Sequence, residues 1–178
     1  MDRAAMKRMR VLAESTQYLY HVTYLGDLPS IQDSGLQAGG GQTFETMENY
    51  SVGRLFFTDE DGLSFWNQRY GEWAEHRSDN PIEQRFIPIT LRMPLSPELE
   101  SNLQQDELGT GDANAESFYV EDGYVAPEAI EAYDGTSWVP IAQIDPEVLQ
   151  NKAEDAAEID EEDGEELLYP DFDVFSPS

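Results

Sequence analysis

Acidic side chains dominate this sequence, in which 37 Asp and Glu residues face 10 Lys and Arg residues and give a formal net charge of -27 in 178 residues. Only two of the basic residues are lysines, Lys7 and Lys152. Charges at this density repel one another at about 0.15 M salt, where the Debye length is roughly 8 Å, and are mostly screened at about 1 M, where it is roughly 3 Å. The scarcity of lysine therefore indicates a protein adapted to molar salt, in a high-salt cytoplasm or in a virion.

Two alternatives to salt adaptation would also produce a large negative charge. A DNA mimic would be strongly acidic, because duplex DNA carries about one charge per 1.7 Å. An acidic tail attached to an ordinary protein is the second alternative. Nucleic-acid binding through a broad electrostatic face is disfavoured, and only a local arginine cluster would support it.

The length suits one domain, and the composition, 39% hydrophobic and 11% aromatic, supplies a core despite the charge. The chain has no cysteine, which excludes disulfides and thiolate metal sites, and we expect no metal. No apolar run approaches the roughly 18 residues of a membrane span, so no membrane partner is expected. The first ten residues contain basic side chains without a following apolar stretch, unlike a signal peptide.

Three parts follow one another along the chain. Residues 1–14 are helix-compatible and hold four of the ten basic residues, which predicts a solvated helix or a partner-binding arm. Residues 15–150 form the predicted domain. Residues 151–178 are an acidic tail with an aromatic end, and this tail either docks onto its own domain or a partner, or is a solvated helix with a frayed end.

The predicted elements of the domain are short strands and few helices. A helix at 28–36 ends at Gly35, a second helix starts after a cap at Asp59 or Asp61, and Pro88 suggests an edge strand or a bulge. Flexible or polar connections are expected at 39–51 and at 94–113 with a turn at 109–111. The strands are predicted at 17–23, 54–58, 85–93, 117–120, 124–125 and 137–141. This order, without regular βαβ alternation, predicts an α+β fold.

Three segments contain residues of types that take part in ligand binding or catalysis. His21 and Thr23 share one face of a predicted strand, where they would hydrogen-bond a ribose or an amide, or form an ordinary half-buried pair. Phe56 and Trp66 would stack a planar ring or pack in the core. Glu116 follows a polar loop, where a carboxylate would bind a sugar hydroxyl and stabilise developing positive charge, or would be one more surface acid.

Together these segments resemble the ADP-ribosyltransferase superfamily, in the branch of the poly-ADP-ribose polymerases and diphtheria-type toxins. In that branch one strand carries histidine, a small residue and Ser or Thr, as in 21–23. A second strand carries two aromatic residues, a small residue and aspartate before a helix with another aromatic, as in 56–59 and Trp66. A third strand begins at the catalytic glutamate, as at Glu116, and 125–130 resembles the segment that follows in toxin-like members and tRNA 2′-phosphotransferases.

The resemblance covers roughly residues 17–142 and implies a split β-sandwich of mostly antiparallel strands with NAD as the substrate. It implies that His21 and Thr23 hold a ribose of NAD, that Phe56 and Trp66 flank the nicotinamide, and that Glu116 and His21 are the catalytic residues. Phe56 stands where this branch usually has tyrosine, and Val22 stands where it usually has glycine.

Some assignments within this resemblance stay open. Glu121 and Glu128 are the next candidates for the catalytic carboxylate, and Arg54 and Arg85 are candidates for a pyrophosphate contact. The leading hypothesis is an NAD-dependent mono-ADP-ribosyltransferase of a salt-loving archaeon or its virus, acting on a protein or nucleic acid. The alternative is a non-enzymatic interaction protein that reuses the fold, such as a virion component.

Overall fold

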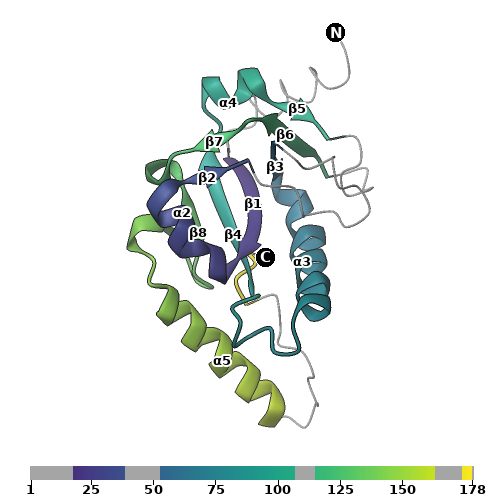
Figure 1. Cartoon of the computed structure of the whole chain (residues 1–178), viewed down its shortest axis with the longest axis vertical. Helices are drawn as coiled ribbons and strands as arrows, with labels where there is room; N and C mark the ends of the chain where they lie inside the picture. The colour runs from purple at the N-terminus through teal and green to yellow at the C-terminus, as the bar shows by residue number, and fades with distance from the viewer. Residues whose placement is uncertain (1–17, 39–52, 107–114, 163–173, 178) are drawn as a thin grey trace.

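A seven-stranded antiparallel sheet forms the centre of the molecule (Figure 1). The computed structural model describes residues 18–38, 53–106, 115–162, with side chains to 157, and 174–177. The strands of the main sheet lie in the order β5-β6-β3-β1-β4-β8-β9, and β2 pairs with β7 in a separate two-stranded sheet. Their bounds are β1 Tyr18–Tyr24, β2 Leu36–Gln37, β3 Arg54–Thr58, β4 Pro88–Pro94, β5 Gln104–Gln105, β6 Ser117–Glu121, β7 Tyr124–Val125, β8 Glu131–Tyr133 and β9 Trp138–Pro140.

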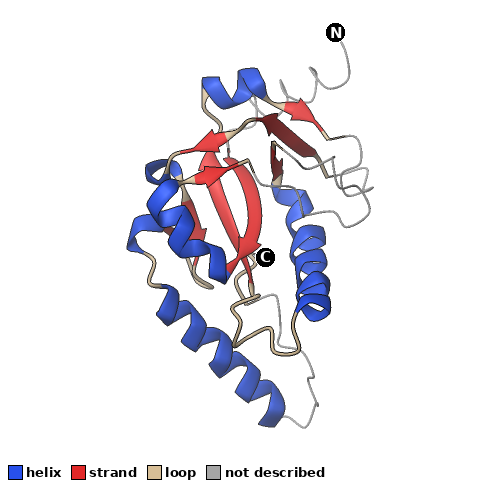
Figure 2. Cartoon of the chain, viewed as in Figure 1, coloured by secondary structure: helices blue, strands red, loops and turns tan. Residues whose placement is uncertain are grey.

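Helices lie on both faces of the main sheet (Figure 2). The α-helices of the described residues are α2 Leu28–Ser34, α3 Leu63–Arg77, α4 Pro97–Asn102 and α5 Pro146–Glu162. Short 3-10 helices are η1 Leu25–Asp27, η2 Glu60–Gly62, η3 Pro127–Ala129 and η4 Ile141–Gln143. The predicted α+β class with a mostly antiparallel sheet and few helices is confirmed.

The alternation of side chains along β1 divides the core in two. Leu19 joins a large buried cluster that includes Leu28 of α2 and Leu149 of α5. Tyr20 and Val22 point to the other face and pack with residues of α3 in a smaller cluster. This alternation is the period-2 pattern of a strand buried on both faces, and it places α2 and α5 opposite α3.

Two local predictions agree closely with the structure, and one is corrected. β3 occupies the predicted residues, and α2 ends at Gly35, whose φ of 80° is readily adopted only by glycine. Pro88 does not mark an edge or a bulge, because β4 lies inside the sheet between β1 and β8. Pro88 is the first residue of β4, opposite Tyr24 at the end of the ladder, where a missing N–H is tolerated.

The sequence did not predict α4, β5 or β8, all of which lie in short polar segments. Ser96 caps α4 by accepting a hydrogen bond from the Leu99 N–H at 3.1 Å. β5 and β8 have two and three residues and exist through pairing with β6 and β4. The predicted arm at 1–14, the loop at 39–51 and the turn at 109–111 lie outside the described residues.

The described residues of the C-terminal part, α5 and 174–177, pack on the domain. α5 begins at Pro146 and continues through the expected start of the tail at 151, with Leu149 and Ala153 buried against the body. Phe175 is fully buried in the large core cluster. Of the alternatives predicted for the tail, residues 174–177 follow the first, because they dock onto the chain's own domain.

Candidate functional site

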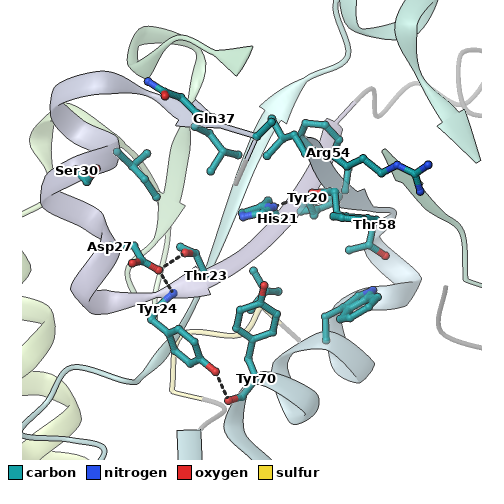
Figure 3. A pocket seen from close by; sticks show the side chains of 18 of the residues that line it. Tyr20, His21, Thr23, Tyr24, Asp27, Ser30, Gln37, Arg54, Thr58 and Tyr70 are labelled. Atoms are coloured by element: carbon teal, nitrogen blue, oxygen red, sulfur yellow. Dashed lines mark hydrogen bonds between the residues drawn. The ribbon is translucent and has the colours of Figure 1, made fainter. Parts of the chain in front are cut away.

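A cavity opens where β1 and β3 part. These two strands share a single residue pair, Tyr20 with Thr58, whereas β1 and β4 remain paired over all seven residues of β1. The space beside this junction is a cavity of about 570 Å³, a volume typical of small-molecule sites. Its walls come from β1, α2, β3, α3 and the start of β6 (Figure 3).

Five residues expected to bind NAD line this one cavity, namely His21, Thr23, Arg54, Phe56 and Trp66. They come from β1, β3 and α3, which are separated by up to 45 positions along the sequence. Hydrophobic packing alone does not require polar and aromatic residues to line one cavity in this way. The fold therefore brings together side chains that the sequence places on three separate elements.

His21 joins the two strands where their backbones do not pair. Its Nδ1 donates a hydrogen bond to the Phe56 carbonyl at 2.7 Å. Burial lowers the pKa of His21 and outweighs the Phe56 carbonyl and the Asp27 carboxylate, which raise it. The imidazole is therefore neutral at neutral pH, and because Nδ1 carries the proton, Nε2 is a hydrogen-bond acceptor.

Thr23 is held by a carboxylate that the sequence did not single out. Its hydroxyl donates to Asp27 Oδ2 at 2.7 Å, and the Tyr24 N–H also points to this oxygen, at 3.3 Å (Figure 3). Asp27 lines the cavity at the end of η1. With its proton engaged, the Thr23 oxygen can accept a hydrogen bond from a ligand.

Aromatic side chains form the wall on the α3 side. Trp66, Tyr70 and Trp73 lie at successive turns of that helix and line the cavity. The Tyr24 hydroxyl donates to the Tyr70 carbonyl at 2.8 Å, and burial raises the pKa of Tyr24 to about 12, so this phenol stays protonated. Phe56 of β3 is half-buried and also lines the cavity, with its ring centre 6.0 Å from that of Tyr119. A planar ligand would meet aromatic surface from two elements.

Two arginines line the cavity, and they are not the pair that the sequence suggested. Arg54 lies with its guanidinium 4.3 Å from the centre of the Tyr119 ring and 3.8 Å from Glu121. Arg77, at the end of α3, also lines the cavity and was missed. Arg85 does not line it, because its guanidinium pairs with Glu147 of α5.

Glu116 lies beside the cavity and is not part of its lining. Its neighbour Ser117 and its cross-strand contact Thr58 do line it. The Glu116 carboxylate accepts a hydrogen bond from Gln105 Nε2 at 3.3 Å. Of the alternative glutamates, Glu121 is exposed at the far end of β6 and Glu128 is exposed on η3.

Two further polar residues of the lining were missed in the sequence. Asp106 and Ser117 are each 5% exposed, and their segments are joined by a hydrogen bond from the Asp106 N–H to the Ser117 carbonyl at 2.8 Å. Within the described part of the chain, the buried Ser117 hydroxyl oxygen has no hydrogen-bond partner. Its position directly after the candidate catalytic glutamate was the only sequence signal for it.

Comparisons of the chain with family models, with curated proteins and with solved structures found no match. Among the described residues, no group of three or more His, Asp or Glu side chains is arranged to hold a metal ion. A search of the same residues found no helix both long and apolar enough to cross a membrane. The geometry gives a candidate small-molecule site, a cavity lined by a neutral histidine, aromatic side chains and two arginines.

Gly62 gives a test of how closely the site is packed. A Cβ at this position would overlap the hydroxyl of Thr58, a β-branched residue that is only 2% exposed. We expect Gly62→Ala to lower the free energy of unfolding by about 1–3 kcal/mol, as overpacked substitutions do. Urea unfolding in molar salt measures the change.

Gly26→Ala is the matched control, because Gly26 also lies in a 3-10 helix and its added Cβ would be 3.5 Å from the Arg85 carbonyl, an ordinary contact. We expect its stability to stay within about 0.5 kcal/mol of the wild type. Equal effects of the two substitutions would contradict the packing argument.

Proposed function

We propose that this chain is an ADP-ribosyltransferase that uses NAD as its substrate, has the split β-sandwich fold of that superfamily, and works in molar salt. The observation that carries the proposal is the gathering of His21, Thr23, Phe56 and Trp66 around one cavity with Glu116 beside it. These residues stand in short motifs on separate segments, and nothing in the motifs themselves requires them to meet. The near-separation of the sheet between β1 and β3 supports the split fold.

The residues of the cavity suit the parts of NAD. The neutral His21 ring and the Thr23 oxygen offer acceptors for ribose hydroxyls. Phe56 and Trp66 offer aromatic faces for the nicotinamide ring. Arg54 and Arg77 supply positive charge for the pyrophosphate in a chain whose net charge is -27.

The proposed reaction is a glycosyl transfer. The bond between the ribose carbon and the nicotinamide nitrogen breaks, and nicotinamide leaves with the electron pair. Glu116 stabilises the positive charge that develops on the ribose. A nucleophile of a protein or nucleic acid then attacks the same carbon and loses its proton, and water in its place would give simple hydrolysis of NAD.

Salt should control this activity in two separable ways. We expect the rate of nicotinamide release to rise steeply between about 0.15 M and 1 M KCl, because screening both stabilises the acidic fold and admits NAD, whose pyrophosphate is negatively charged. The measurement is nicotinamide release by chromatography, with circular dichroism on the same samples. Sucrose at low salt is the control, because it favours the folded state without screening charge. We therefore expect sucrose to restore the fold while the KM for NAD stays high.

The proposal has a clear negative outcome. A chain that is folded in molar KCl, releases no nicotinamide and shows no NAD-dependent rise in melting temperature contradicts it. That result would favour the alternative of a non-enzymatic interaction protein, for which the expected finding is stoichiometric copies of the chain within a particle.

A further inference from the structure

The backbone of Glu116 is held on both sides by two residues at the end of β3. Its N–H donates to Asp59 Oδ2 at 2.9 Å. Its carbonyl accepts from the Asp59 N–H at 3.0 Å and from the Thr58 hydroxyl at 3.2 Å. We call these three hydrogen bonds the backbone anchor of Glu116.

Asp59 ties this anchor to the helix on the other side of the site. Its second oxygen, Oδ1, accepts the Gly62 N–H at 3.0 Å and so caps η2, which leads directly into α3 with Trp66. One carboxylate thus connects the segment carrying Glu116 to the segment carrying the aromatic wall. Charge-assisted hydrogen bonds of this kind are about twice as strong as neutral ones.

We propose that Asp59 is a positioning residue for the reaction, and that its carboxylate sets the location of Glu116 through the backbone anchor. This inference rests on the proposed function, in which Glu116 acts on the ribose. Both carboxylate oxygens of Asp59 accept backbone N–H groups, of Gly62 and of Glu116, so Asp59 works through Glu116 and not by touching the substrate. A helix cap alone would require only the bond to Gly62, and the bond to Glu116 is the additional feature.

The protonation state of Asp59 gives the inference a measurable signature. Burial raises the pKa of Asp59 to about 6, against the lowering effect of the Glu116 and Gly62 N–H donors. The charged groups that face it are Asp61 on η2 and Glu116 itself, and both raise this pKa further. Below about pH 6 one carboxylate oxygen carries a proton and becomes a poorer acceptor. The anchor should therefore weaken as the pH falls through that value.

Asp59→Asn is the main test because the two oxygens of Asp59 serve two different donors. The asparagine oxygen can still cap Gly62, a role for which Asn and Asp are equivalent, but its NH₂ group then faces the Glu116 N–H. We expect kcat for nicotinamide release to fall about 10- to 100-fold with KM within about twofold. We also expect the loss of activity near pH 6 to disappear, although His21 is unchanged.

Asp61→Asn is the matched control. It makes the same chemical change two positions away, on an exposed side chain. We expect its kcat to remain within about twofold of the wild type. Its pH profile should keep the acid limb, moved to somewhat lower pH because the Asp61 charge no longer raises the pKa of Asp59. Asp59→Ser adds a second variant, because serine keeps the cap but is too short to reach Glu116. It should show the same fall in kcat.

Hydrogen exchange of the Glu116 amide separates this inference from the proposed function. In molar salt, we expect this amide to be protected in the wild type and to exchange at least about tenfold faster in Asp59→Asn and Asp59→Ser, with or without NAD turnover. An inactive wild type with this exchange pattern would reject the proposed function and leave the anchor standing. Unchanged Glu116 exchange in the two folded variants, or unchanged kcat and pH profile in an active enzyme, would overturn the inference.

Discussion

Replacing Glu116 with glutamine should lower the rate of nicotinamide release about 100- to 1,000-fold, the range seen when one group that stabilises transition-state charge is removed. Glutamine has the size of glutamate and keeps an acceptor for the Gln105 Nε2 donor, so the local structure should survive. It removes only the negative charge that stabilises the positive charge developing on the ribose. Single-turnover assays in molar KCl would measure the chemical step directly, and circular dichroism would verify the fold.

Glu121→Gln is the control for this prediction. Glu121 lies at the other end of β6, is exposed, and pairs with Arg54 at 3.8 Å. An exposed pair of this kind contributes little to stability. We expect the variant to keep kcat, with at most a modest change in KM through Arg54. A severe loss in Glu121→Gln together with an active Glu116→Gln would move the catalytic role to Glu121.

Phe175→Ala should lower the free energy of unfolding by about 3–5 kcal/mol, the usual cost of deleting a fully buried phenylalanine. Phe175 is 0% exposed and packs in the large core cluster, near Gly135. For a chain of this length the loss corresponds to a fall in melting temperature of about 6–20 °C. Thermal unfolding in molar KCl, followed by circular dichroism, measures it. The effect would make the last residues of an acidic tail part of the domain core.

Val148→Ala provides the comparison, because Val148 is 48% exposed on α5 and its loss leaves no cavity. We expect its melting temperature to change by no more than about 2 °C. A Phe175→Ala protein that melts with the wild type would mean that residues 174–177 contribute no packing.

Local signals in the sequence were sufficient for the elements that lead into the site. The β-branched and aromatic run of β3 and the glycine that ends α2 are visible without any tertiary information. The cap at Asp59 was also predicted, as one of two alternatives, because an aspartate before a helix accepts a backbone N–H. β8 could not be found in this way, because its three residues become a strand only through their partners in β4 and β9.

The residues that line the cavity also fall into two groups, those that the sequence identified and those that it did not. His21, Thr23, Phe56 and Trp66 were identified because each stands in a recognisable motif. Arg77 and Asp106 belong to no recognisable motif. They line the cavity only because the ends of their helix and strand face it in the folded chain. Arg54 and Arg85 were equal candidates in the sequence, and pairing with Glu147 on α5 is what separates Arg85 from the cavity.

The sequence by itself determined the acidic character of the chain, the α+β class and the residue types that line the candidate site, because these depend on composition and short-range pattern. Tertiary structure alone decided that β1 and β3 meet at one residue pair and leave a cavity there, since strand divergence depends on packing between distant segments. It also decided that Asp59 holds the backbone of Glu116 across 57 positions and that Phe175 belongs to the core. Such long-range contacts are formed by the closing of the whole chain, and no local pattern encodes them.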